Sequence, residues 1–487
     1  MQVGNEKLAF DCRQYINDII HVELPKMYER IFHQNIHPDS YINIGAVHVN
    51  LGVLQEDDFK KNFIAIVEQK LILELKTLFE ESPAYTAESP QNIGGSGHDD
   101  SPFDDQTSSV QYSSVQHSSV QYSTEKEQKS AALLFYLEHG NYPWWYNNET
   151  IKSPSEILYA FDSEEQRSFL FKIVARSRSI AIPEIEGLLT RFVNCLDVAD
   201  CEIYINYTIK LYNDNTLEIN INMLLSQRDQ LIKLFNIALK SFYTQLFSFI
   251  FLHANEPDFL KIFFLKLKNT FPISTEELKE RIGKADIEAS IFGFTEKKDQ
   301  NINSAKDTIQ NIKRTKTTQS EKGLYIHNAG LIVVHPFLPI YFRGLDLIND
   351  KNQFVSVKAQ MKATVLLYYL QQRDQDYKEW EMPLNKILCG MNSNEVIDGD
   401  IELSEKEINE SELLLQTVVG YWVALKGSSV ESMLNTFFLR EGKITYKQDH
   451  WLLQVERNGF DILLDRLPWS IGTIKLPWLK DLIHTEW

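Results

Sequence analysis

The chain has 487 residues, 43% of them hydrophobic, and a net charge of −18. This length suffices for two or three packed domains, and the acidic balance argues against nucleic acid or anionic lipid as the main partner. The cysteines are scattered and do not suit a disulfide framework, so buried free thiols in a reducing cytoplasm are expected at four positions: Cys12, Cys195, Cys201 and Cys389.

The first segment, residues 1–81, is predicted to hold a strand and one long helix. Its first residues lack a basic start followed by an apolar run, so no signal peptide is expected. Residues Tyr41–Leu51 alternate apolar and polar side chains and slip in phase at Gly45–Ala46, as a strand with a bulge does. Apolar residues at helical spacing from Phe59 to Leu78 predict an amphipathic helix that packs on this strand or on a partner.

Two segments have the composition of linkers. Residues 82–128 are rich in Ser, Gly and Gln and include three tandem copies of a five-residue unit, Ser108–Tyr122. Such a segment buries too little apolar surface to offset the entropy of ordering, so disorder is predicted, with a weak β-aggregation tendency from alternating Val and Tyr. Residues 296–322 hold seven Lys or Arg against four acidic residues and are predicted to be a solvated loop in preference to a binding arm.

The middle segment, residues 129–295, is predicted to be mostly helical. Ser153–Glu156 and Ser163–Gln166 have the pattern of capping boxes that begin helices. Apolar residues from Ile185 to Leu196 recur at helical spacing and predict an amphipathic helix.

A β-hairpin and a long apolar helix are predicted in the second half of this middle segment. Ile203–Leu211 and Leu217–Ile221 alternate on either side of a turn at Asn213–Thr216, which is typical of a hairpin. A helix is predicted from about Arg228 to His253. Its most apolar window, Leu246–Leu252, is too short for a membrane span and predicts burial.

The last segment, residues 323–487, begins with the apolar stretch Leu331–Tyr341. A capping box at Ser404–Glu407 predicts a helix, and alternation at Lys443–Tyr446 and Trp451–Val455 predicts strands. The predicted fold class is α+β, predominantly helical with short strands and hairpins, in several compact pieces joined by disordered linkers.

The sequence offers no set of residues that predicts catalysis, a cofactor or a metal. His33 and His37 have a chelating spacing but lack the glutamate of a zinc-protease motif, and Pro38 ends any helix there. His335 precedes Pro336 in an apolar run and is expected to be a core histidine. Acidic residues between 398 and 407 suit a helix N-terminus, and nucleotide-binding and nucleophile-elbow motifs are missing. We therefore predict a protein that is not an enzyme.

The most specific local signal is the C-terminal module, Trp451–Trp487. It contains two Leu-Pro-Trp corners, in which proline fixes the chain at a bend and the indole supplies an anchoring surface. The candidate interaction residues in this module are Trp451, Glu456, Arg457, Leu467, Pro468, Trp469, Leu476, Pro477 and Trp478. The pattern alone indicates two corners of a small β-rich module, each pinned by a tryptophan.

This module resembles the tape-measure protein family of contractile injection systems, which are phage-tail-like particles. Leu137–Trp145, with Pro143, Trp144 and Trp145, is similar to that family's Pro-Trp-Trp motif. Three more stretches are similar to segments of the family: Asn328–Pro339 (with His335 and Pro336), Leu384–Gly390 and Ile44–Leu54.

The resemblance implies a structural assembly role without catalysis, in which the C-terminal module is a rigid end-piece that docks onto another component. A tape measure occupies the lumen of the inner tube, and tube subunits polymerise around it until its end is reached. Implied partners are inner-tube subunits, baseplate or hub proteins and tube-terminating proteins, with self-association left open. The implied location is the cytoplasm during assembly and then the particle lumen. An assembly chaperone or baseplate-associated adaptor of the same particle is the alternative.

Overall fold

The computed structural model describes residues 24–35, 41–44, 47, 49–51, 56–80, 120–146, 153–177, 179–254, 256–271, 273–274, 277, 280–281, 323–397 and 401–487. The chain divides into two compact units, Met1–Lys129 and Ser130–Trp487. The linker predictions for residues 82–119 and 296–322, the buried thiol at Cys12 and the metal-binding question at His37 lie outside the described residues. The division into five segments stays a prediction.

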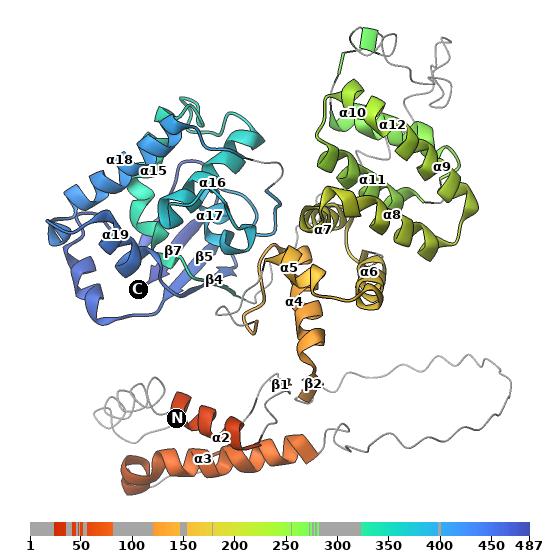
Figure 1. Ribbon diagram of the computed structural model, residues 1–487. Coiled ribbons are helices and arrows are strands. Elements are labelled where there is room, and N and C mark those ends of the chain that lie inside the picture. Colours follow the sequence, from red (N-terminus) through yellow and green to blue (C-terminus); the bar gives the residue numbers. More distant parts are fainter. Residues whose placement is uncertain are drawn as a thin grey trace, which may run out of the picture. The chain divides into compact units, whose positions relative to one another are not determined.

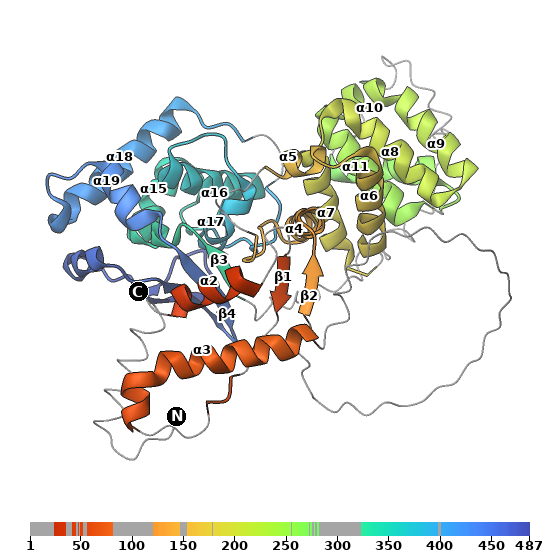
Figure 2. The same ribbon diagram turned by 60° about the horizontal axis from the view of Figure 1, so that its bottom comes forward.

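Among the described residues of the first unit, the helices α2 (Leu24–Asn35) and α3 (Glu56–Glu80) pack on each other. The helix predicted from Phe59 to Leu78 is confirmed. Its apolar stripe buries Leu71 and Leu75 against Met27 and Ile31 of α2, and Arg30 pairs with Glu68 at 2.6 Å beside them. Figure 2 shows the two helices lying next to each other.

A two-stranded antiparallel sheet completes this unit. Strand β1 (Tyr41–Ile44) is shorter than the predicted strand, because Val47 and residues 49–51 are outside any strand. Its partner β2 (Val120–Ser123) lies at the end of the last pentapeptide copy, where a disordered linker was predicted. That prediction is wrong for residues 120–128, because Val and Tyr favour strands and Thr124–Glu127 forms a cap that begins the next helix.

The second unit contains two hydrophobic cores. The first defines the helical lobe, residues 130–281, and the second defines the C-terminal lobe, residues 323–487. The helices of the helical lobe are α4 (Glu125–His139), α5 (Pro154–Tyr159), α6 (Ser163–Ser177), α7 (Ile182–Cys195), α8 (Val198–Tyr212), α9 (Asn215–Ser226), α10 (Arg228–Phe235), α11 (Leu239–His253) and α12 (Phe259–Thr270).

Side-chain caps begin several of these helices. Ser153 caps α5 with Pro154 in its first turn, as predicted, and the amphipathic helix predicted from Ile185 is α7. The cap predicted at Ser163 is wrong by one residue. Asp162 accepts hydrogen bonds from the first turn of α6, and Glu165 accepts from the Asp162 backbone, because a carboxylate is the stronger acceptor at this position.

The predicted hairpin is wrong: both of its strands are helices, α8 and α9. Buried residues on α8 recur at helical spacing, at positions 201, 204, 205, 208 and 209, whereas Ile203 and Leu211 are exposed. Asn213 takes a left-handed conformation that ends α8, and Asp214 caps α9. The predicted turn is therefore a helix-to-helix connection.

The long apolar helix predicted over 228–253 is broken. Asn236 adopts a left-handed conformation between α10 and α11, and the two helix axes bend by 109°. The window Leu246–Leu252 is confirmed as part of a buried helix, since four of its apolar residues lie in the core. Among the described helices, none alone has the length and apolar character to cross a membrane, whereas α10 and α11 meet that criterion only as a bent pair.

The C-terminal lobe packs helices onto one five-stranded mixed sheet of order β3-β4-β5-β7-β6 (Figure 1). Its strands are β3 (Leu324–Ile326), β4 (Gly442–Lys447), β5 (His450–Val455), β6 (Thr473–Ile474) and β7 (Leu482–Glu486). Its helices are η3 (Ala329–Phe337), α15 (Leu338–Gly344), α16 (Val357–Gln372), η4 (Glu379–Glu381), α17 (Pro383–Leu388), α18 (Glu405–Tyr421), η5 (Val423–Leu425), α19 (Val430–Met433), η6 (Leu434–Phe438) and η7 (Gly459–Arg466). The α+β fold class is confirmed.

Two predictions in this lobe hold. Strands β4 and β5 form an antiparallel hairpin in the register Lys447↔His450, and β5 buries alternate residues as its pattern indicates. Ser404 and Glu407 form the predicted capping box of α18, and Glu405 and Glu407 lie in its first turn, where acidic side chains are favoured. Residues 398–400 lie outside the described residues.

Candidate functional site

A buried ion triad joins the helical lobe to the C-terminal lobe. Arg191 of α7 and Lys386 of α17 both contact Oε1 of Glu379 in η4, at 3.0 and 2.8 Å. The three side chains are between 0% and 9% exposed. Arg191 also donates to backbone carbonyls on both lobes, at Leu137 (3.1 Å) and Asn394 (2.6 Å). One guanidinium therefore ties together three segments that are distant in the sequence.

Opposing effects set the charges in this triad. Burial alone would raise the pKa of Glu379, but the positive charges of Lys386 and Arg191 outweigh it and hold the pKa below its ordinary value. Burial lowers the pKa of Lys386, although the Glu379 carboxylate acts against this change. An ion pair held in this way contributes little net stability but is costly to break.

Gly140 allows the close approach on which the triad depends. Its φ of +75° is a conformation that favours glycine, and a Cβ there would lie 2.6 Å from Nη2 of Arg191. The glycine thus ends α4 and leaves room for the guanidinium. The chain then turns into Tyr142, Pro143 and Trp144, which lie over the C-terminal lobe.

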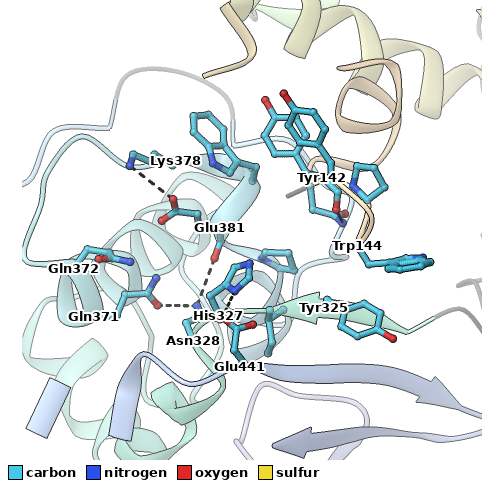
Figure 3. A pocket seen from close by; sticks show the side chains of 16 residues that line it. Tyr142, Trp144, Tyr325, His327, Asn328, Gln371, Gln372, Lys378, Glu381 and Glu441 are labelled. Carbon is cyan, nitrogen blue, oxygen red and sulfur yellow. Dashed lines mark hydrogen bonds and ion pairs between the residues drawn. The ribbon is translucent and has the colours of Figure 1, made fainter. Parts of the chain in front are cut away.

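These residues line a pocket of about 470 Å³ between the two lobes (Figure 3). Aromatic rings supply much of its lining. Trp380 lies 6.0 Å from Tyr142 and Trp144 lies 6.4 Å from Tyr325, measured between ring centroids. The aromatic lining comprises Tyr142, Trp144, Tyr146, Tyr325 and Trp380.

Amide side chains lie on the other side of the pocket in Figure 3. Asn328 donates from Nδ2 to Oε1 of Gln371 and to Oδ1 of Asn385, both at 2.7 Å. Glu381 accepts from Tyr368 at 3.3 Å and lies 3.7 Å from Lys378, while His327 contacts Glu441 at 2.5 Å. The pocket thus presents neutral amides and aromatic faces, with two carboxylates against one ammonium.

Three of the motif stretches singled out in the sequence meet here. Leu137–Trp145 supplies Gly140 and two of the pocket aromatics, Tyr142 and Trp144. Asn328–Pro339 supplies Asn328, and Leu384–Gly390 supplies Asn385 and Lys386. Sequence patterns missed Arg191, although its place among the apolar residues of an amphipathic helix was a usable signal. No comparable sequence pattern indicated that Glu379 would be buried.

The Pro-Trp-Trp residues differ in exposure. Pro143 is buried and Trp145 is half-buried against the core of the helical lobe, whereas Trp144 is 70% exposed. His335 is half-buried, with Nδ1 2.9 Å from the carbonyl of Ile332, and burial lowers its pKa. Pro336 is exposed.

Both Leu-Pro-Trp corners are fastened to the C-terminal lobe itself. Trp469 donates from Nε1 to the carbonyl of Val333 at 3.0 Å, and Trp478 donates to Leu388 at 2.8 Å. The leucine Leu476 is buried and Leu467 is half-buried, while Pro468 and Pro477 are exposed.

The other candidates of the C-terminal module lie in or directly after β5, the central strand of the sheet. Trp451 is buried in β5, and Glu456 and Arg457 are exposed just after it. Arg457 donates to the carbonyl of Trp487 at 2.7 Å. Docking of this module onto another component stays a prediction.

Replacing Trp478 with phenylalanine should lower the free energy of unfolding by about 1–3 kcal/mol, because the carbonyl of buried Leu388 loses its indole donor. Thermal unfolding followed by circular dichroism measures the loss. The matched control is Trp144→Phe, at an indole that is 70% exposed, where a change within about 0.5 kcal/mol is expected. Equal losses for the two variants would contradict an anchoring role for Trp478.

Within the part of the chain that the structure describes, no cluster of three His, Cys, Asp or Glu side chains could hold a metal ion. Cys195, Cys201 and Cys389 are buried free thiols, as predicted.

Comparison with known proteins gives one assignment. No curated protein and no solved structure matches the chain significantly. Residues 1–487 match the family described as contractile injection system tape measure protein. Because the match spans the motif stretches and every described element, the chain belongs to the contractile injection system tape measure protein family.

Proposed function

We propose that this chain sets the length of the inner tube while a contractile injection particle assembles. The observation that carries the proposal is the family match over residues 1–487. In this role the chain lies in the tube lumen and acts without catalysis. It contacts inner-tube subunits along its length and baseplate, hub or tube-terminating proteins at its ends.

The length of the helices constrains how such a ruler would work. A fully helical chain would reach on the order of 700 Å, whereas the 25 residues of α3 reach only about 37 Å. The described residues fold into compact pieces in which each hydrophobic core is closed. If the chain keeps these folded pieces in the tube, its end-to-end length is shorter than its contour length. Residues inserted between two pieces should therefore change the end-to-end length more than residues inserted within one piece.

The same compact pieces favour the alternative function, an assembly chaperone or baseplate-associated adaptor. Two closed cores and a buried ion triad make a rigid body that suits docking. An adaptor of this kind would be required for assembly without fixing the length of the tube.

Tube length in particles that carry an altered chain separates the two functions. Insertion of a helical segment of 40 residues between Lys129 and Ser130, where the chain passes within α4 from the first unit to the second, should lengthen the tube by up to about 60 Å, because each helical residue adds about 1.5 Å. Electron microscopy of purified particles measures the length of the tube.

The matched control places the same insertion between Ile397 and Ile401. Both of these residues are buried in the C-terminal lobe, so an insertion there forms a side loop and adds nothing between the pieces. A ruler predicts unchanged tubes for this control. Unchanged tubes for both insertions, with the chain missing from purified particles, would overturn the ruler and favour the chaperone.

A further inference from the structure

The pocket between the lobes contains buried polar atoms that have no partner among the described residues. These atoms are Oδ1 of Asn141, Oδ1 of Asn328, Nε2 of Gln371 and Nε1 of Trp380. The three amide side chains are 2% to 5% exposed, and all four residues line the pocket. A buried polar group left without a hydrogen bond is unfavourable, so a ligand that satisfies these groups would be favoured.

The pattern of these groups indicates what the ligand offers. Two acceptors and two donors stand close to aromatic faces, so the ligand must present both N–H or O–H donors and carbonyl-type acceptors beside apolar surface. A peptide backbone flanked by side chains has this chemistry. The lining carboxylates, Glu381 and Glu441, outnumber the single ammonium, Lys378, which disfavours an acidic ligand.

Strand β3 supplies the second observation. It is the terminal strand of its sheet, it pairs with β4 on one side, and no strand of the described residues pairs with it on the other. Its residues Tyr325 and Ile326, with His327, line the pocket, whereas no residue of β4 does. A terminal strand presents unpaired N–H and C=O groups, which is the template for strand addition.

Trp144 gives the site an exposed anchor at its rim. Its side chain is 70% exposed and lies 6.4 Å from Tyr325, which is 50% exposed. Tryptophan and tyrosine are enriched among the residues that contribute most to binding at protein interfaces, so this pair is suited to hold a bound peptide.

We propose that this pocket and the open edge of β3 bind an extended peptide segment of a partner protein as an added strand, with an apolar or basic side chain in the pocket. The proposal goes beyond the ruler function, because the site would bind its peptide whether the chain measures the tube or acts as an adaptor. The unpartnered amides and Trp380 would then hydrogen-bond to the bound backbone.

A displayed library of random octapeptides, selected on the full chain, provides the probe. Enriched sequences should carry a central apolar or basic residue, and synthetic copies are measured by fluorescence anisotropy. Binding should weaken at least tenfold with Trp144→Ala and with Gln371→Leu, and with peptides N-methylated at alternate backbone nitrogens. The matched control is Phe460→Ala, at an aromatic residue of similar exposure (62%) on η7 that is not among the pocket-lining residues, where affinity should not change.

Circular dichroism and melting curves establish that each variant folds, and the N-methylated peptides test the wild-type chain directly. The proposal is overturned if selection on the wild-type chain enriches no peptide that selection on the Trp144→Ala variant does not also enrich. It is overturned as well if N-methylation of the peptide leaves its affinity unchanged. It is also overturned if chitohexaose or cellohexaose binds in the same pocket while peptides do not, since a sugar offers the same donors and acceptors. None of these measurements depends on tube length.

Discussion

Replacing Glu379 with glutamine should lower the free energy of unfolding by about 3–5 kcal/mol, because two cations then stay buried without their anion. Arg191 and Lys386 both reach the same carboxylate oxygen and are 1% and 0% exposed. Glutamine has nearly the volume of glutamate, so the lost charge accounts for most of the effect. Guanidinium denaturation at pH 7, followed by tryptophan fluorescence, measures the difference.

The control for this prediction is Glu412→Gln in the ion pair with Arg373, whose side chains are 22% and 45% exposed. Solvent screens this pair, so a loss below about 1 kcal/mol is expected. Lys386 and Arg191 hold the pKa of Glu379 below its ordinary value, so the contribution of its charge to stability is present above that ordinary value and is lost as pH falls through the lowered one. The gap between wild type and Glu379→Gln should therefore narrow in acid. Equal losses for both substitutions would contradict the importance of the triad.

Helix starts with a side-chain cap could be predicted from the sequence, because capping acts between residues three positions apart. Ser153 and Ser404 begin α5 and α18 as their patterns indicate. The failure at Ser163 has the same cause, since Asp162 offers a second cap one position earlier and has the better acceptor. Because these helix N-termini are set by hydrogen bonds between residues that are close in the sequence, a short sequence pattern can predict them.

Alternation was a weaker guide where most positions are apolar. In β5 the buried residues Trp451, Leu453 and Val455 alternate with more exposed ones, and the strand is confirmed. Residues 203–211 also alternate, but Tyr204 and Thr208 complete a helical stripe that faces the core. Tertiary packing then selects the helix, and the sequence pattern alone fits both structures.

The candidate site was predictable only in pieces. The motif stretches that contain Gly140, Asn328 and Lys386 were identified from the sequence, but nothing in them shows that they meet. Arg191 and Glu379 are 188 residues apart, and their contact follows from how the two lobes pack. A pattern in a short window reports the face of one helix and carries no information on which distant charge that face meets.

The substitution Gly330→Ala should lower the free energy of unfolding by about 3 kcal/mol or more, because the added methyl has no room. Gly330 lies in η3, buried against η6, and a Cβ there would lie 1.6 Å from the carbonyl oxygen of Phe437 and 2.9 Å from Cα of Phe438. Both are backbone atoms, so a side-chain rotation cannot relieve the overlap. Relief requires that η3 and η6 separate, which opens the core around Leu331 and Phe438.

The matched control for Gly330→Ala is Gly420→Ala in α18, in the same lobe. A Cβ at Gly420 meets nothing within 4 Å, and alanine is the better helix former by about 1 kcal/mol, so stability should hold or rise slightly. Urea denaturation measures the free energy of unfolding of both variants. The steric overlap affects only Gly330→Ala, whereas Gly420→Ala reports the change in helix propensity alone. If Gly330→Ala melted like Gly420→Ala, η3 and η6 would have to shift apart at little cost. The close contact between η3 and η6 would then not be what stabilises the position of Asn328–Pro339 in the C-terminal lobe.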